Sequence, residues 1–176
     1  MSETWFTSDT HYGHKNILQY EKEARPFETI EEMHEVLIHN WNSVVAPADI
    51  VYHLGDFCFG RGNIRHAGRL NGKKRLVLGN HDVYQSHDYL LYFDKLYGVK
   101  FWEQCILSHM PVHPRHLGSR WFVNVHGHLH SNNVMIPNHK IIEDMSYFNV
   151  SVEQHNLTPV NADVIRARIK EVRELE

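Results

Sequence analysis

The most constraining feature of this sequence is a short apolar run that ends abruptly in a polar turn. Residues 73–78 read Lys-Lys-Arg-Leu-Val-Leu and predict a short buried strand. Gly79 follows and permits a sharp change of backbone direction, after which come Asn80, His81 and Asp82. Ordinary turns use the same residue types, so this stretch alone leaves a structural turn and a ligand site both open. Ligands of open α/β sheets bind where strands end, and the rest of the chain decides between the two.

Two earlier strand patterns end in the same way. Residues 4–8 are rich in aromatic and β-branched side chains and predict a strand, which leads to Asp9 and His11. Residues 49–54 predict a second strand, followed by a glycine and Asp56. In an extended segment, side chains two residues apart point to the same side. We therefore expect Asp9 and His11 to bind one ion together.

Histidines follow the strand patterns of the second half of the chain. Residues 104–107 predict a strand that leads to His109 in a proline-containing loop. Residues 121–125 predict another strand, which leads to His128 and His130. The chain has 16 histidines in 176 residues, well above ordinary usage. Histidine is the commonest metal ligand, although no single site would use all 16.

Periodicity and capping predict the other elements. Thr29 and Glu32 form a capping box before a helix over 30–45. His34 and His39 lie off the apolar stripe of that helix and are expected in solvent. Further predictions are helices over 63–70 and 85–93, strands over 99–102 and 147–152, and a final helix capped by Asn161 with Val164, Ile165, Ile169 and Val172 facing inward.

Composition places the chain among ordinary globular proteins. We expect residues 1–176 to form one domain with a mixed α/β fold, because no repeat or linker interrupts them. The net charge of −3 gives no global footprint for nucleic acid. Cys58 and Cys105 show no disulfide or CxxC pattern, and Cys58 is expected to be a small buried residue. The polar start and the lack of a run near the roughly 20 apolar residues that span a bilayer predict a cytoplasmic protein without membrane segments.

The polar residues at the strand ends form one chemical set. Its members are Asp9, His11, Asp56, Asn80, His81, His109, His128 and His130. Carboxylate, amide and imidazole without thiolate suit Mn, Fe or Zn rather than a structural zinc–cysteine site. There are too many candidates for one tetrahedral ion, which favours two ions about 3.5–4 Å apart with a bridging carboxylate. Such a pair serves phosphate ester hydrolysis by activating a shared water and neutralising the transferring phosphoryl group.

The sequence resembles the calcineurin-like metallophosphoesterases, and their short bacterial and phage-type members in particular. Five motifs in register carry this resemblance: Asp9-Thr10-His11, Gly55-Asp56, Gly79-Asn80-His81-Asp82, His109 and Gly127-His128-Leu129-His130. They span most of the chain. The resemblance implies a four-layer αββα sandwich whose active site lies at the ends of the sheets.

The resemblance also implies a role for each motif residue. The first ion would bind Asp9, His11, Asp56 and His130, and the second would bind Asp56, Asn80, His109 and His128, with Asp56 bridging the two. His81 would contact the phosphate or protonate the leaving oxygen. Many members carry a second Asp three residues after the bridging one, where this chain has Phe59. A backbone carbonyl or Asp82 is therefore expected to orient His81, and His14 and Arg25 are candidate phosphate contacts.

The expected function is hydrolysis of a phosphomonoester or a phosphodiester, and the sequence leaves these two open. The expected cofactors are two divalent ions, manganese first, with Fe, Zn and Ni also compatible. The expected substrate is a small phosphorylated molecule or an exposed phosphoryl end, because the chain has no room for a cap domain and no basic excess for nucleic acid. A catalytically silent scaffold and a small nuclease are the alternatives. Retention of every ligand and of His81 favours an enzyme, and no pattern specifies an oligomeric state.

Overall fold

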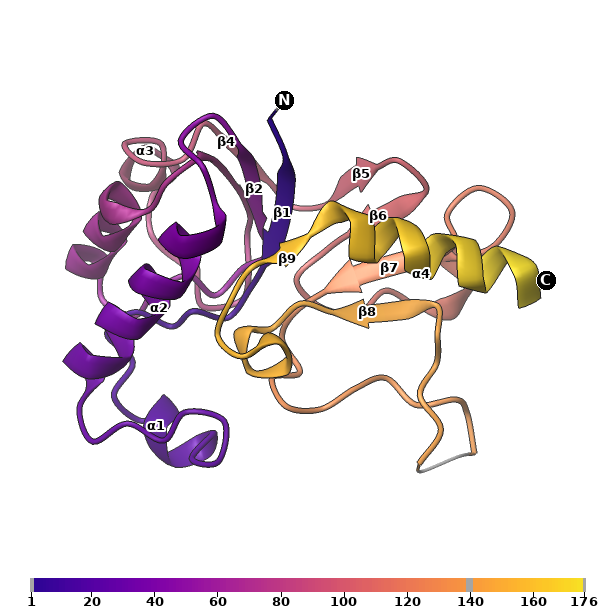
Figure 1. Ribbon diagram of the computed structural model, residues 1–176, viewed down its shortest axis with the longest axis horizontal. Coiled ribbons are helices and arrows are strands. Elements are labelled where there is room, and N and C mark those ends of the chain that lie inside the picture. Colours follow the sequence, from indigo (N-terminus) through magenta and orange to yellow (C-terminus); the bar gives the residue numbers. More distant parts are fainter. Residues whose placement is uncertain (1, 139–140, 176) are drawn as a thin grey trace.

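The computed structural model describes residues 2–138 and 141–175, which form two sheets with flanking helices (Figure 1). The first sheet contains β1 (Thr4–Thr7), β2 (Ile50–His53), β3 (Lys73–Val77), β4 (Lys95–Tyr97) and β9 (Val160–Asn161). Their order is β4-β3-β2-β1-β9, in which β1 to β4 are parallel and β9 is antiparallel to β1. Because β1, β2 and β3 are parallel, their carboxyl ends meet at one edge of the sheet.

The second sheet follows directly along the chain. It contains β5 (Lys100–Trp102), β6 (Cys105–Leu107), β7 (Val123–His126) and β8 (Tyr147–Asn149), in the order β5-β6-β7-β8. Strands β6, β7 and β8 are parallel, and β5 is antiparallel to β6. Two mostly parallel sheets confirm the predicted mixed α/β fold.

Helices and short 3₁₀ turns connect the strands. They are α1 (Ile17–Tyr20), α2 (Ile30–Val44), η1 (Arg61–Arg69), α3 (Ser86–Tyr89), η2 (Pro114–His116), η3 (Val152–His155) and α4 (Ala162–Leu175). Helix α2 begins where the capping box predicts, because the Thr29 side chain accepts the Glu32 N–H. Its apolar face, with Met33 and Trp41, packs in one core with Val51 and Leu76 of the first sheet. No helix in the described residues is long and apolar enough to cross a bilayer.

A second core joins the two sheets. Phe6 and Val77 of the first sheet pack in one buried cluster with Val123 and Val125 of the second. Helix α4 contributes Ile165 and further apolar residues to the same cluster, and it runs along the second sheet (Figure 1). This shared core fixes the strand ends of one sheet relative to those of the other.

Several local expectations need correction. His34 is not in solvent, because its Nε2 accepts the Gly13 N–H at 2.8 Å and its side chain is buried. His39 is exposed, as expected. Val164 points outward and is 48% exposed, and Ala162 lies with Ile165 on the inward face of α4 instead. The helix expected over 85–93 is only the single turn α3, and β4, β9 and α1 are too short to produce a clear period.

Candidate metal centre

Asp56 stands in the middle of the strand-end residues. Its Oδ2 lies 3.6 Å from His11 Nε2, 3.4 Å from His109 Nε2 and 3.8 Å from His81 Nε2. Its other oxygen, Oδ1, accepts the His81 backbone N–H at 2.9 Å. The side chain is 2% exposed. Because His11 follows the first sheet and His109 follows the second, this carboxylate lies between imidazoles from both sheets.

A first group of ligand atoms forms around Asp9. Atoms of Asp9, His11 and His130 all lie within 4.8 Å of one another. Asp9 Oδ1 and His11 Nε2 are buried, and neither has a hydrogen-bond partner among the described residues. A buried polar atom without a partner is costly, and a divalent cation between these atoms would satisfy both. Carboxylate and imidazole donors suit Mn, Fe or Zn, so these residues fit a metal ion.

A second group forms on the other side of Asp56. Atoms of Asp9, Asp56 and His109 lie within 4.8 Å of one another. Asn80 Oδ1 is 3.0 Å from His109 Nε2, and the rings of His109 and His128 are 5.0 Å apart. The structure thus brings together all seven predicted ligands, from five loops. It also places Asp9 near both groups, where the sequence analysis assigned it to the first ion alone.

Hydrogen bonds at the opposite ring nitrogens orient two of the histidines. His109 Nδ1 lies 2.8 Å from the Leu54 carbonyl oxygen, which leaves Nε2 facing Asp56. His130 Nδ1 lies 2.8 Å from Glu153 Oε1, which leaves Nε2 facing Asp9. Metal-binding histidines commonly donate their second N–H to a carbonyl or carboxylate, which fixes the tautomer and the ring.

Glu153 is a site residue that the sequence analysis missed. It lies in η3, and its side chain is fully buried. Arg25 donates to Glu153 Oε1 through Nε at 2.8 Å and through Nη2 at 2.6 Å. No motif marks Glu153, because its contact with His130 joins two residues that are distant in sequence.

Arg25 does not occupy the position of a substrate contact. Its side chain is 0% exposed, whereas the sequence made it a candidate phosphate contact. Besides Glu153, the guanidinium donates to the backbone carbonyl oxygens of Asp9 and Thr10. Arg25 therefore ties the Asp9 loop to Glu153 from beneath the site.

The His81 ring packs against Phe59 and does not contact the Asp82 side chain through a hydrogen bond in the described residues. The His81 side chain is 43% exposed, and its ring centroid lies 4.6 Å from that of Phe59. Phe59 in turn stacks on His14, with centroids 3.9 Å apart and planes 14° apart. Phe59 thus forms an apolar wall beside His81, at the position where the resemblance leads one to expect an Asp. His14 lies in the site next to His11, with their Nδ1 atoms 3.3 Å apart.

Asp82 holds the loops together from behind the site. Its carboxylate accepts backbone N–H groups from Asp56 at 2.8 Å, Phe57 at 3.1 Å and Gly79 at 2.9 Å. It makes no hydrogen bond to the His81 ring among the described contacts, so it orients the loops and not the imidazole. A Cβ at Gly79 would collide with Asp56, which explains the glycine in this motif.

The ligand loops have an uncommon backbone conformation. Five candidate ligands have left-handed φ values: Asp9 (57°), His11 (51°), Asp56 (56°), His128 (71°) and His130 (49°). The extended segment expected for Asp9 and His11 is therefore wrong, although their side chains do converge. Non-glycine residues in this region are strained, and such strain concentrates at functional sites.

Burial and neighbouring charges separate acids from bases in the site. Burial alone would raise the pKa of Asp9, but the nearby imidazoles of His11, His109 and His130 hold that pKa well below its usual range. Burial lowers the pKa of His53 to about 3 and that of His126 to about 4. Both are fully buried, at the ends of β2 and β7. Among the candidate ligands, burial lowers the pKa of His11 and that of His128. Burial also opposes protonation of His109 and His130, but the carboxylates of Asp56 and Glu153 raise the pKa of these two imidazoles above the usual value. Metal binding would displace a proton from such an imidazole.

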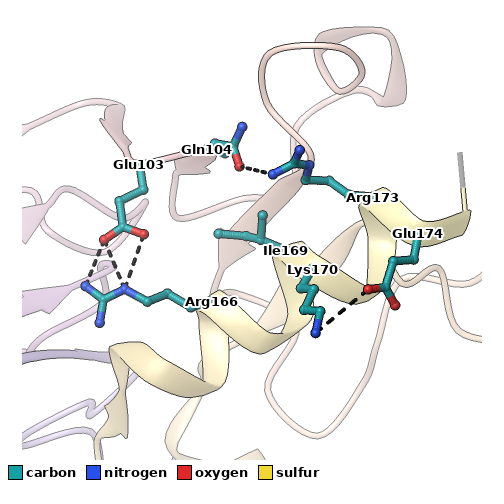
Figure 2. Close-up of a pocket in the computed structure, with 7 residues that line it drawn as sticks. All are labelled: Glu103, Gln104, Arg166, Ile169, Lys170, Arg173 and Glu174. Carbon is teal, nitrogen blue, oxygen red and sulfur yellow. Dashed lines mark hydrogen bonds and ion pairs between the residues drawn. The ribbon is translucent and has the colours of Figure 1, made fainter.

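A cavity elsewhere on the molecule lacks comparable chemistry. It lies between α4 and the turn between β5 and β6, at the end of β6 opposite His109 (Figure 2). Four of its five charged groups form ion pairs, Arg166 with Glu103 and Lys170 with Glu174, and Arg173 donates to Gln104. The strand-end cluster is therefore the stronger candidate for a functional site.

Comparison with known proteins agrees with the geometry. A sequence model of the calcineurin-like phosphoesterase family matches residues 3–166. The chain belongs to the calcineurin-like phosphoesterase family. Members of the family are generally metal-dependent phosphoesterases, which fits the candidate ligand groups around Asp9 and Asp56.

The chain is similar to proteins from an archaeon, a phage and a bacterium. An uncharacterized protein of Methanocaldococcus jannaschii is 36% identical over 174 residues, which cover 94% of this chain and 90% of that protein. The gene 66 protein of Mycobacterium phage L5 is 44% identical over 87 residues, or 47% of this chain and 41% of the phage protein. The crystal structure of a protein of unknown function from Aquifex aeolicus has a TM-score of 0.71 at 29% identity, covering 95% of this chain and 99% of that one. The phage match supports the predicted likeness to short phage-type members.

Proposed function

We propose that the protein hydrolyses a phosphomonoester or a phosphodiester with the help of two divalent ions, manganese first. The observation that carries this proposal is the position of Asp56 Oδ2, within 3.6 Å of imidazole nitrogens from loops of both sheets. Two unpartnered ligand atoms beside it, Asp9 Oδ1 and His11 Nε2, add a second reason to expect a cation. The family match supports the phosphoester class of substrate.

The proposed ligand division assigns Asp9 to one ion, although Asp9 lies near both groups of side chains. Asp9, His11, Asp56 and His130 would hold one ion, and Asp56, Asn80, His109 and His128 would hold the other. Bound ions of this kind lower the pKa of water and neutralise charge on a phosphoryl group. The protein's own contribution is to fix the ligands: Glu153 and the Leu54 carbonyl set two imidazoles, and Asp82 sets the Asp56 loop.

His81 is the proposed general acid. It is more exposed than the neighbouring ligands His11 and His109, and its Nε2 lies 3.8 Å from Asp56 Oδ2, at the mouth of the site. From there its ring would donate a proton to the oxygen that leaves phosphorus, which stabilises the departing alkoxide. Phe59 limits the swing of the ring on one side.

The substrate and setting are part of the same proposal. The substrate is a small phosphorylated molecule or an exposed phosphoryl end, because a net charge of −3 provides little attraction for a nucleic acid backbone. The ligand set draws on loops of both sheets, which requires the chain to act as one domain. Cys58 and Cys105 are both free and buried, and free thiols suit a reducing, cytoplasmic compartment.

Hydrolysis of p-nitrophenyl phosphate and bis-p-nitrophenyl phosphate tests the proposal. Chelation should abolish turnover, and Mn²⁺ should restore it better than Mg²⁺, because imidazole-rich sites disfavour Mg²⁺. Asp56→Asn should lose turnover and metal together. Asp94→Asn, at an exposed position just before β4, should retain both. Full activity of Asp56→Asn would contradict the proposal. Metal binding without turnover of any ester would favour a silent scaffold.

A further inference from the structure

A groove opens beside the candidate metal centre on the side of Asn80 and His109. Its volume is about 390 Å³, and both of these residues line it. Leu78, Met110 and Val99 form much of the remaining wall. The groove is thus continuous with the second ligand group and draws on the loops after β3, β4 and β6.

The wall of this groove is apolar and open. Val99 is 51% exposed and Met110 is 49% exposed. Apolar side chains gathered beside a few polar groups are typical of ligand sites. The residues that line the groove, all of them in the described part of the chain, include no Asp, Glu, Lys or Arg. A charged substituent would find no partner there, whereas an uncharged one would bury apolar surface.

We propose that the groove binds the uncharged, apolar organic group of the phosphoester substrate, an aryl or alkyl group. This inference rests on the proposed function and adds to it the class of substrate. Because Asn80 and His109 lie at the junction, a phosphoryl group held at the centre would direct its ester substituent over Val99 and Met110. Recognition of substrates would then come from this apolar contact, and the metal centre would supply the phosphoryl site.

Gly98 offers a way to obstruct the groove without disturbing the fold. It lies in the groove wall, and an added Cβ would meet no atom within 4 Å. Its backbone is not in the left-handed region. Gly98→Leu would therefore place a side chain in open space at the groove. Gly62 in η1 has equally open surroundings away from the groove, so Gly62→Leu is the matched control.

The experiment measures binding of phenylphosphonate, methylphosphonate and inorganic phosphate to the Mn²⁺-loaded protein by calorimetry. The wild type should bind phenylphosphonate about tenfold more tightly than methylphosphonate, a modest value for apolar selectivity. Gly98→Leu should remove this preference and leave phosphate affinity unchanged. Met110→Glu should also remove it, by placing a charge in the wall. Gly62→Leu should keep it.

The outcomes separate this inference from the proposed function. Equal affinity of the wild type for both phosphonates, or a preference that survives in Gly98→Leu and Met110→Glu, would overturn the apolar subsite. Manganese-dependent hydrolysis of the p-nitrophenyl esters would still stand in that case. Conversely, a phenyl preference that Gly98→Leu removes, in a protein without any manganese-dependent hydrolysis, would overturn the proposed function and retain the subsite.

Discussion

Glu153 Oε1 and His130 Nδ1 lie 2.8 Å apart and join a buried carboxylate to a candidate metal ligand. On its other side, Glu153 receives two hydrogen bonds from the fully buried Arg25. The side chains of Arg25, Glu153 and His130 therefore form a continuous series of hydrogen bonds from the protein interior to the candidate metal centre. The orientation of that ligand depends on residues that never reach the substrate.

Glu153→Gln tests this relationship. The amide is a weaker acceptor for the His130 ring, so affinity for Mn²⁺ should fall about 10–100-fold. Calorimetric titration of the metal-free protein measures it, with Glu171→Gln on the exposed face of α4 as control. Thermal unfolding of both metal-free variants should accompany the titration, because Arg25 also loses its charged partner. Unchanged metal affinity would show that Glu153 serves only to neutralise Arg25.

Arg25→Met tests the structural role of the arginine. Removing it leaves Glu153 as an uncompensated buried charge, which should lower the free energy of unfolding by about 3–5 kcal/mol. Arg65→Met removes an exposed arginine and should leave that free energy almost unchanged. Urea unfolding provides the measurement. A variant of normal stability with a raised KM for phosphate esters would instead reinstate Arg25 as a substrate contact.

Asn80→Ala and His81→Ala should separate metal binding from proton transfer. Asn80→Ala should weaken one ion and activity together. His81→Ala should keep both ions and lower kcat by about 10²–10⁴. The loss should be larger for alkyl phosphates than for p-nitrophenyl phosphate, whose leaving group departs with little help from a proton. Loss of an ion from His81→Ala, or equal slowing of all leaving groups, would rule out the role of general acid.

His53 should make the metal-free protein less stable in mild acid. Burial lowers its pKa to about 3, from 6.5 in the unfolded chain. Between these values the unfolded chain binds a proton that the folded chain excludes, so stability is full above pH 6.5 and falls as the pH drops towards 3. Urea midpoints at pH 7.5 and 5.0 measure the fall. His53→Gln cannot titrate and should show a smaller difference between the two pH values, and an equal difference would assign the effect to other groups.

The sequence predicts which polar residues gather at the strand ends, because each of them follows a short strand pattern and parallel strands bring such ends together. The sequence predicts that the side chains of Asp9 and His11 converge, which they do. The predicted extended backbone is wrong, because both residues have left-handed φ values. The sequence does not predict the role of Glu153, because this residue lies in a single 3₁₀ turn without a motif. The sequence does not predict the burial of His34, because a helical period cannot show that a neighbouring loop covers this side chain. That loop donates the Gly13 N–H to His34 Nε2.

The five left-handed ligand residues also bear on how such a chain would evolve after losing its activity. Each holds a conformation that costs on the order of 1 kcal/mol or more, and that glycine adopts freely. Metal binding would offset this cost, because it requires a carboxylate or an imidazole where glycine has no side chain. Relatives that no longer bind metal should therefore drift to glycine or asparagine first at the positions of Asp9, His11, Asp56, His128 and His130. In a newly sequenced relative, the residues at these five turns would show whether the ancestral chemistry persists.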